Sequence, residues 1–231
     1  MVIYRPETAL QQVLHALRNV PGFVGLSARR KLARRYGKRA VADFDTRLRQ
    51  IGPGDAVVDV GANVGLFTAR LADTGAEVHA WEPDPYAFDR LTNRFSGVAN
   101  VHLHNAAVAQ RPGRLRLARK AAFNRDPGRY STASSIYFAP EVGGDSIEVD
   151  VVAFDEALAR CKAPVKLVKM DIEGAEFDIL TSIFADPAAC PAEALYVETH
   201  EMLDPAKIPL IDRLRAEAES LPRPVVNLYW P

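Results

Sequence analysis

The chain has 231 residues, of which 48% are hydrophobic and 25% are charged, and its formal net charge is zero. This composition is that of an ordinary soluble globular protein, and the length suits one α/β domain with an N-terminal extension. Because no global field exists, the charge balance gives no reason to expect nucleic acid or an acidic substrate as a partner.

The charge is unevenly distributed along the chain. Residues 1–50 hold eleven basic and three acidic residues, whereas the remainder holds 18 basic and 26 acidic residues, so the two parts carry about +8 and about −8. Two cysteines, Cys161 and Cys190, form no disulfide framework, and the first twenty residues lack the apolar core of a signal peptide. No apolar run approaches the roughly 20 residues that span a bilayer. We therefore expect a cytoplasmic protein without a transmembrane segment.

The first fifty residues are predicted to be helical. A helix is expected over 7–19, a basic helix over 27–36 and a further one over 43–49, before the turn "GPGD" at 52–55. Four apolar residues share one face of the first helix: Leu10, Val13, Leu14 and Leu17. We expect this basic extension, residues 1–51, to dock against the acidic body, residues 52–231. The alternatives are a dimer contact, substrate capture or binding to an anionic membrane.

Strands and helices then alternate. Strands are expected at 56–60, 77–81, 101–105, 165–170, 194–199 and 225–230, and helices at 64–73, 85–95, 154–161, 174–184 and 205–219. Residues 106–119 contain two short extended runs around Pro112 and Gly113, which predict a hairpin, and 147–154 predict another extended run. The long polar segment 119–146 is expected to be a loop that closes over a ligand. Apolar strands separated by helices predict a Rossmann-like, mostly parallel sheet of six to seven strands, covered on both faces.

The turn after the first strand, "VVDVGANVG", indicates which ligand the sheet binds. Gly61 allows a tight turn, and Gly65 allows a close approach of the helix to the sheet. A dinucleotide fingerprint would place its second glycine at position 63, where backbone approaches a pyrophosphate, but Asn63 stands there. A cofactor without phosphates, such as S-adenosylmethionine, needs no such approach.

Two polar residues follow the next two strands. Glu82 ends the second strand, where a carboxylate accepts both hydroxyls of a ribose, which S-adenosylmethionine and NAD both contain. Asn105 ends the third strand, where its side chain and the Ala106 backbone could meet an adenine ring. A simpler alternative is that Asn105 only caps the strand end.

The fourth strand leads into an acidic stretch, "VKMDIEGAEFD". Lys169 lies inside an apolar strand, so we expect it to be buried and paired with Asp59 or Glu198 on a neighbouring strand. Asp171 and Glu173 lie at the end of this strand, over the expected reacting centre. Two further acids are expected on a solvated helix face: Glu176 and Asp178.

The fifth strand ends "YVETHE", which brings His200 to the same edge of the sheet. A histidine there could take a proton from a substrate hydroxyl, and Glu173 is the alternative base. Four residues, Asp171, Glu173, Glu198 and His200, could also hold Mg²⁺ or Mn²⁺, although no ligand spacing demands a metal and we predict none. A structural role is expected for His79 and His15.

Several segments resemble the FkbM-type methyltransferases in order and spacing: "VVDVGANVGLFTARLA", "VHAWEPDPYAFDRL", "HNAAVA", "VDVVAFDEAL", "VKMDIEGAEFDIL" and "LYVETHE". The resemblance covers residues 52–203 and implies a seven-stranded sheet, S-adenosylmethionine as donor and O-methylation of a sugar, polyketide or similar hydroxyl. It also implies that a serine of "STASSIY", Ser134 or Ser135, touches cofactor or substrate. The basic extension departs from the family pattern, and one clear strand follows "YVETHE", so the closing strand is in doubt.

The resemblance and the residues together give a set of expected contacts. The cofactor is expected to contact Asp59, Gly61, Ala62, Asn63, Gly65, Glu82, Pro83, Asn105, Ala106, Ser134 and Asp171, and the catalytic residues are expected to be His200, Glu173 and Asp171. The predicted partner is a small-molecule hydroxyl acceptor, with no nucleic acid and a possible homodimer. Two alternatives stay open: an NAD-dependent oxidoreductase, and a non-catalytic cofactor-binding protein that uses the basic extension to bind a partner or a membrane.

Overall fold

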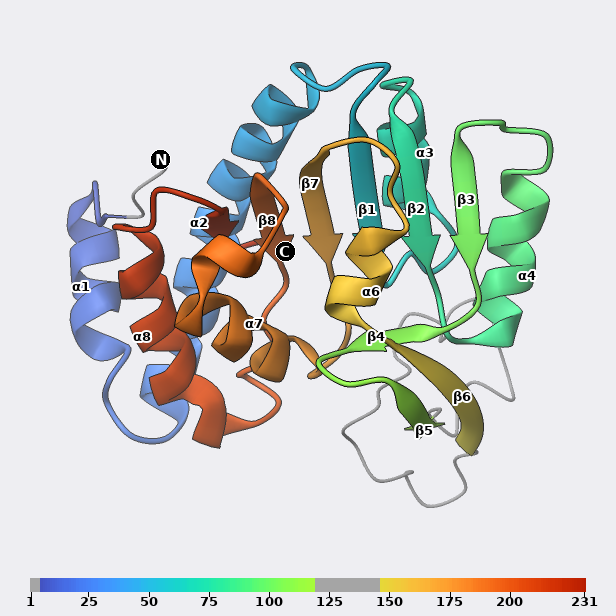
Figure 1. Ribbon diagram of the computed structural model, residues 1–231. Helices are drawn as coiled ribbons and strands as arrows, with labels where there is room; N and C mark the ends of the chain where they lie inside the picture. The colour runs from blue at the N-terminus through green and yellow to red at the C-terminus, as the bar shows by residue number, and fades with distance from the viewer. Residues whose placement is uncertain (1–4, 119–145) are drawn as a thin grey trace.

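The computed structural model describes residues 5–118 and 146–231, and its centre is a six-stranded sheet in which every pairing is parallel (Figure 1). The strand order is β3-β2-β1-β7-β8-β9. The strands of this sheet are β1 (Ala56–Val60), β2 (Glu77–Trp81), β3 (Val101–His104), β7 (Val165–Met170), β8 (Ala194–Val197) and β9 (Val225–Asn227). The order reverses between β1 and β7, and ligands of such sheets bind beyond the carboxyl ends at this point. The predicted Rossmann-like parallel sheet is confirmed.

Helices cover both faces of the sheet. The helices are α1 (Ala9–Leu17), α2 (Phe23–Leu48), α3 (Leu66–Ala72), α4 (Pro85–Arg94), α6 (Phe154–Ala159), α7 (Glu176–Ala185) and α8 (Ile208–Ala218), with short 3-10 turns η3 (Pro187–Ala189) and η4 (Pro205–Lys207). Alternate residues of one strand point to opposite faces. Val58 therefore packs with α6, α7 and α8, whereas Val57 packs with α2 and α3. Helix α4 packs through Leu91 against Ala80 of β2.

A second, three-stranded sheet lies beside the main one, and it corrects the predicted hairpin. Its strands are β4 (Ala107–Ala109), β5 (Gly113–Ala118) and β6 (Ser146–Ala153), in the order β4-β6-β5. The two runs around Pro112 and Gly113 do form strands, but they do not pair with each other. Both pair with β6, which lies between them, parallel to β4 and antiparallel to β5. The hairpin was wrong because local spacing cannot reveal a partner strand that arrives some thirty residues later.

The two helices expected at 27–36 and 43–49 are a single helix, α2, of 26 residues. Gly37 weakens a helix on propensity alone, and it interrupts the sequence pattern. In the folded chain a Cβ at Gly37 would lie 3.3 Å from Pro231 and 3.5 Å from the Tyr229 carbonyl oxygen. The glycine therefore lets residues 229–231 lie against α2, and this tertiary packing stabilises a helix that continues without a break through Gly37.

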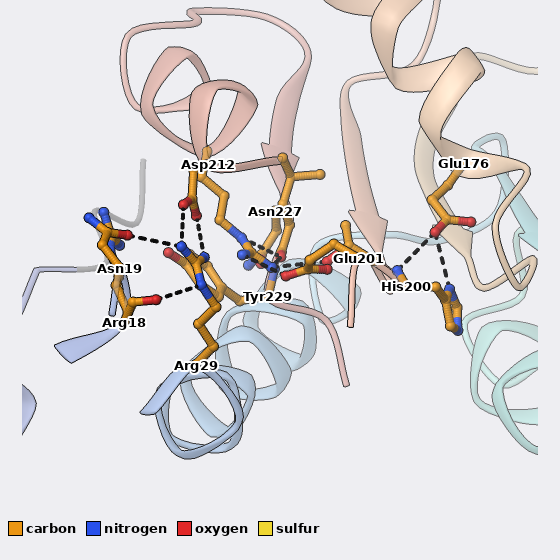
Figure 2. Close-up of polar contacts among 12 residues, drawn as sticks. Arg18, Asn19, Arg29, Glu176, His200, Glu201, Asp212, Asn227 and Tyr229 are labelled. Carbon is orange, nitrogen blue, oxygen red and sulfur yellow. Dashed lines mark hydrogen bonds and ion pairs between the residues drawn. The ribbon is translucent and has the colours of Figure 1, made fainter. Parts of the chain in front are cut away.

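The expected docking of residues 1–51 against the body is confirmed, mainly by apolar packing. Phe44 is fully buried, with its ring centroid 5.1 Å from that of Tyr196 on β8 and 4.5 Å from that of Trp230. A bidentate ion pair adds to it, because both Arg29 guanidinium NH₂ groups donate to the Asp212 carboxylate, at 2.9 and 2.7 Å (Figure 2). Helix α2 thus shares the core of the main sheet.

The last strand, β9, continues the main sheet by pairing parallel with β8. Within the described residues, one strand follows β8, so no antiparallel closing strand is seen there. The main sheet accordingly has six strands, the lower of the two numbers expected.

Candidate functional site

The turn after β1, residues 61–65, is fixed by contacts to β2 and β7. The backbone N–H groups of Gly61 and Ala62 both donate to the Trp81 carbonyl, at 3.0 and 2.9 Å. Gly61 has φ +81°, and a Cβ there would lie 1.8 Å from the carbonyl oxygen of Asp171. No larger residue fits this position, so the requirement for glycine comes from contact with the segment after β7.

The second half of the turn points a backbone donor at Glu82. Asn63 has φ +49°, a left-handed conformation that Asn tolerates better than most residues. Its N–H donates to Glu82 Oε2 at 2.8 Å, and its own Oδ1 accepts from the Val64 N–H at 2.7 Å. Gly65 begins α3 with φ +82°, and a Cβ there would lie 2.7 Å from Leu91 of α4. The start of α3 at Gly65 therefore approaches helix α4 closely, and not the sheet as we expected.

Glu82 is buried, with 7% of its surface exposed, at the end of β2. Its Oε1 accepts the Asp84 N–H at 2.8 Å, so each carboxylate oxygen already holds one backbone donor. Burial raises the pKa of Glu82 to about 7, against the opposing effect of these hydrogen bonds. An ionised carboxylate offers about four acceptor positions, which leaves one on each oxygen for a further donor.

Asn105 ties the end of β3 to the segment after β2. Its Nδ2 donates to the carbonyl oxygens of Glu82 and Pro83, at 2.8 and 3.2 Å. These bonds orient the amide so that Oδ1 is its remaining polar atom. Ala106, next in the chain, is buried. The strand-end role of Asn105 is thus present, and an adenine amino group would meet its Oδ1.

A buried ion pair joins β1 to β7. Lys169 Nζ lies 3.3 Å from Asp59 Oδ1 and donates to the Gly61 carbonyl at 2.7 Å, and the two side chains are 3% and 0% exposed. Burial alone would lower the pKa of Lys169, but the charges of Asp59 and Asp171 raise it above its usual value, so the lysine stays cationic. The expected pairing with Asp59 is confirmed. Asp59 is fully buried and also accepts from the Thr68 hydroxyl at 2.7 Å, so it shapes the turn from beneath.

Beyond the ends of β7 and β8, His200 lies among four carboxylates, which we call the His200 cluster: Asp171, Glu173, Glu176 and Glu198. His200 Nε2 lies 3.5 Å from Glu173, 3.7 Å from Asp171 and 4.0 Å from Glu198. The catalytic residues expected from the sequence are therefore brought together. Asp171 also lies 3.9 Å from Lys169, which links the cluster to the turn after β1.

Glu176 was expected on a solvated helix face, and this was wrong. It is fully buried, and its Oε1 accepts both the backbone N–H of His200 at 2.9 Å and a bond from His200 Nδ1 at 3.1 Å (Figure 2). Its Oε2 accepts the Gly174 N–H at 2.7 Å. The signal that could have found it is a carboxylate in the first turn of a helix, where backbone N–H groups lack partners. Asp178, by contrast, is exposed as expected.

The pKa values of two groups in the His200 cluster, His200 and Glu198, are strongly raised. Burial lowers the pKa of His200, but the hydrogen bond and charge of Glu176, with Glu173 and Asp171, outweigh it and raise the pKa to about 9. Burial, and then the charge of Asp171, raise the pKa of Glu198 to about 7. His200 is consequently an imidazolium at neutral pH, and it gains a free Nε2 lone pair only at higher pH.

Two further placements complete the comparison with the sequence. Ligand atoms of Asp171, Glu198 and His200 lie within 4.8 Å of one another, so these three side chains could hold a divalent ion. His79 lies outside this cluster, where its two ring nitrogens contact Glu77 at 3.1 Å and His104 at 3.0 Å. The expected contact from Ser134 or Ser135 and the expected lid over 119–146 fall almost entirely outside the described residues.

The parallel sheet, the glycine turn and the acid after β2 define a Rossmann-like methyltransferase fold. The chain belongs to the FkbM methyltransferase family, since the family model described as "Methyltransferase FkbM domain" matches residues 59–216. This membership favours methyl transfer over the NAD-dependent oxidoreductase alternative. No helix of residues 5–118 and 146–231 is both long and apolar enough to cross a membrane.

Three relatives show the range of the similarity. The 31-O-demethyl-FK506 methyltransferase FkbM of Streptomyces tacrolimicus is 30% identical over 159 residues, which cover 58% of this chain and 61% of that protein. The hexuronic acid methyltransferase AglP of Haloferax volcanii is 26% identical over 162 residues, 70% of this chain and 62% of that protein. The chain thus spans about three fifths of the length of both. A rRNA adenine N-6-methyltransferase of Streptomyces fradiae is 36% identical over 77 residues, 33% of this chain and 24% of that protein.

Proposed function

We propose that the protein is an S-adenosylmethionine-dependent O-methyltransferase that acts on a hydroxyl of a sugar, glycoside or polyketide-like small molecule. Family membership supports the transfer of a methyl group. The two longer matches are to proteins named for a demethylated FK506 and for a hexuronic acid, and both support a small hydroxylated acceptor. The chemistry of the residues at the ends of the strands supports the same assignment, one half of the site at a time.

The residues after β1, β2 and β3 suit an adenosine with a short charged tail. Glu82 keeps one acceptor position on each oxygen, which matches the two hydroxyls of a ribose. Asn105 offers its Oδ1 to the amino group of adenine, beside Pro83 and the buried Ala106. Bound S-adenosylmethionine supplies a sulfonium methyl group that is already electrophilic. The turn at residues 61–65 and Asp171 would then line the methionine end.

The His200 cluster is proposed to manage the proton of the acceptor hydroxyl. His200 Nε2 faces the three partly exposed carboxylates of the cluster, while Glu176 holds Nδ1 and thereby fixes the ring orientation. Glu173 and Asp171, on the same side as Nε2, would orient the hydroxyl group and stabilise the imidazolium that forms. Since the pKa of His200 is raised to about 9, the proton-accepting form increases as the pH rises toward 9.

The observation that carries this proposal is the pair of His200 with the fully buried Glu176. Nε2 of His200 faces further carboxylates, and one of them, Asp171, links the pair through Lys169 to the turn after β1. A binding protein without catalysis would not need such a group. The direct test measures S-adenosylhomocysteine release with labelled S-adenosylmethionine and a panel of uronic-acid glycosides, nucleotide sugars and polyketide alcohols. Tight cofactor binding without turnover on any hydroxyl acceptor would favour the non-catalytic alternative.

A further inference from the structure

The N-terminal helices leave an unusual amount of apolar surface uncovered. Within the described residues, nine large apolar side chains are strongly exposed, and six of them fall between positions 10 and 24. We call these six the apolar patch: Leu10, Val13, Leu17, Val20, Phe23 and Val24. Phe23 is 83% exposed, the highest value of the nine. Docking of α1 and α2 onto the body therefore leaves this surface uncovered, although it covers the opposite side of α2.

A row of cations continues from the apolar patch along α2. Arg30, Lys31, Arg34 and Lys38 are all exposed, and we call them the basic row. Phe23, Arg30, Arg34 and Lys38 are separated by seven, four and four residues, so they share one side of the helix with Val24 and Lys31. The buried side chains of the helix, such as Leu32 and Tyr36, lie on the other side.

The basic row is not neutralised by the acidic body. No ion pair joins any of its four cations to another described residue, whereas Arg29, on the packed side, is bound to Asp212. The sequence contains no acidic residue between Glu7 and Asp43, but it contains eight basic ones there. This segment therefore presents one sign of charge to solvent over its whole length.

We propose that the apolar patch and the basic row form a docking surface for an anionic lipid bilayer. Aliphatic side chains next to Lys and Arg match the boundary between acyl chains and negatively charged headgroups. RNA would supply the same negative charge, but five of the six side chains in the apolar patch are aliphatic and have no face on which bases stack, so the patch as a whole matches acyl chains better than bases. The inference stands on the surface alone and does not depend on the proposed reaction.

The docking surface and the candidate site lie toward the same end of the molecule. In Figure 1 the α1–α2 turn lies at the end of the molecule toward which the arrows of the main sheet point. The candidate site lies at that same end, beyond the carboxyl ends of the strands. A protein docked through this turn would hold the site close to the bilayer, so that acceptors displayed on a membrane surface could reach it.

The test is vesicle flotation of the full chain, with vesicles of phosphatidylcholine alone and of phosphatidylcholine mixed with phosphatidylglycerol. We expect binding to the anionic vesicles only, weakened by added salt. Arg30→Gln/Arg34→Gln should lower the partition coefficient about 25-fold, at about fivefold per cation. Phe23→Ser/Val24→Ser should lower it more than about tenfold. The matched controls, Arg49→Gln/Arg223→Gln and Val98→Ser, change exposed residues away from the α1–α2 turn and should bind like the parent.

Unchanged melting temperatures establish that the variants are folded. If a double variant melts early, Arg34→Gln alone, with an expected fivefold loss, replaces it. The proposal is overturned if the parent floats with neither vesicle, or if it floats equally with both. It is also overturned if the parent binds an rRNA fragment but no vesicle, or if light scattering shows a dimer that Phe23→Ser/Val24→Ser converts to a monomer without vesicle binding.

Discussion

Glu82 and Glu198 are two carboxylates at the same end of the main sheet, and burial raises the pKa of each to about 7, but for different structural reasons. Glu82 faces backbone N–H groups of Asn63 and Asp84, and no basic side chain makes an ion pair with it within the described part of the chain. Glu198 faces Asp171, Glu173 and the imidazole of His200. The environment of Glu82 consists of backbone dipoles with fixed directions, whereas that of Glu198 consists of side chains that can gain or lose a proton.

Under the proposed function, this difference would separate cofactor binding from proton transfer. Backbone donors hold Glu82 in one orientation, so its remaining lone pairs keep the same direction whether or not a ligand is bound. The His200 cluster places five titratable groups together, so adding or removing one proton changes the charge felt by all the others. We therefore expect changes on the Glu82 side to alter affinity, and changes on the His200 side to alter rate and pH dependence.

The largest effect is expected from His200→Asn. Loss of a general base lowers turnover by about 10²- to 10⁴-fold. The variant should bind S-adenosylmethionine like the parent, because His200 contacts the cluster and not the segments around Glu82. Calorimetry and single-turnover rates measure the two quantities separately. Equal losses of affinity and rate would break the proposed division of the site.

Lys169→Met should destabilise the whole fold by roughly 3–5 kcal/mol, since it leaves Asp59 charged, buried and without its cation. Chemical denaturation measures this free energy. The matched control is Lys166→Met on the same strand, where the lysine pairs with Glu193 at a partly exposed position and should contribute little. If both variants unfolded at the same denaturant concentration, the ion pair would not be the link between β1 and β7.

Glu82→Gln should weaken S-adenosylmethionine binding by about 10- to 100-fold, from the loss of charged hydrogen bonds. In the parent, Glu82 ionises as the pH rises through about 7, so affinity should increase between pH 6 and pH 8. The variant should lose this pH dependence. Glu198→Gln serves as the control, and its affinity profile should follow that of the parent. A flat profile in the parent would show that the ionised form of Glu82 is not required.

The smallest effect is a displaced pH profile in Glu176→Gln. Glu176 contributes most to the raised pKa of His200, about 9, ahead of Glu173 and Asp171, so its neutral replacement should move the rise in turnover toward lower pH. The same shift has a stability consequence. A histidine whose pKa is higher folded than unfolded stabilises the fold below pH 6.5 and loses that contribution as the pH rises to 9. Comparing unfolding free energies of parent and His200→Asn across this range measures it. Identical slopes would contradict the raised pKa.

The sequence predicted the elements whose signal is local. Apolar runs marked the strands of the main sheet. A charged residue inside one of them, Lys169, predicted a partner on a neighbouring strand, Asp59 or Glu198, and the structure pairs it with Asp59. The hairpin at 106–119 and the burial of Glu176 could not be predicted in this way. Each depends on where a distant segment arrives: β6 between β4 and β5, and the loop carrying His200 against the start of α7.

Helix α2 was divided in two for the same reason. Gly37 interrupts the pattern, and its partner, Pro231, is almost at the other end of the sequence. A pattern confined to a short window contains no information on that contact.

This contact between distant residues also determines the order in which the chain can fold during synthesis. Helix α2 is synthesised before residues 196–230, yet its buried face contacts four residues of that later segment: Tyr196, Asp212, Tyr229 and Trp230. Until those residues are made, Phe44 and Tyr36 lack these ring contacts, although Phe44 can already pack against Phe67. The packing of α2 is therefore completed only when residues 229–231 lie against it, and deleting these residues should reduce the yield of folded protein before it affects any residue of the site.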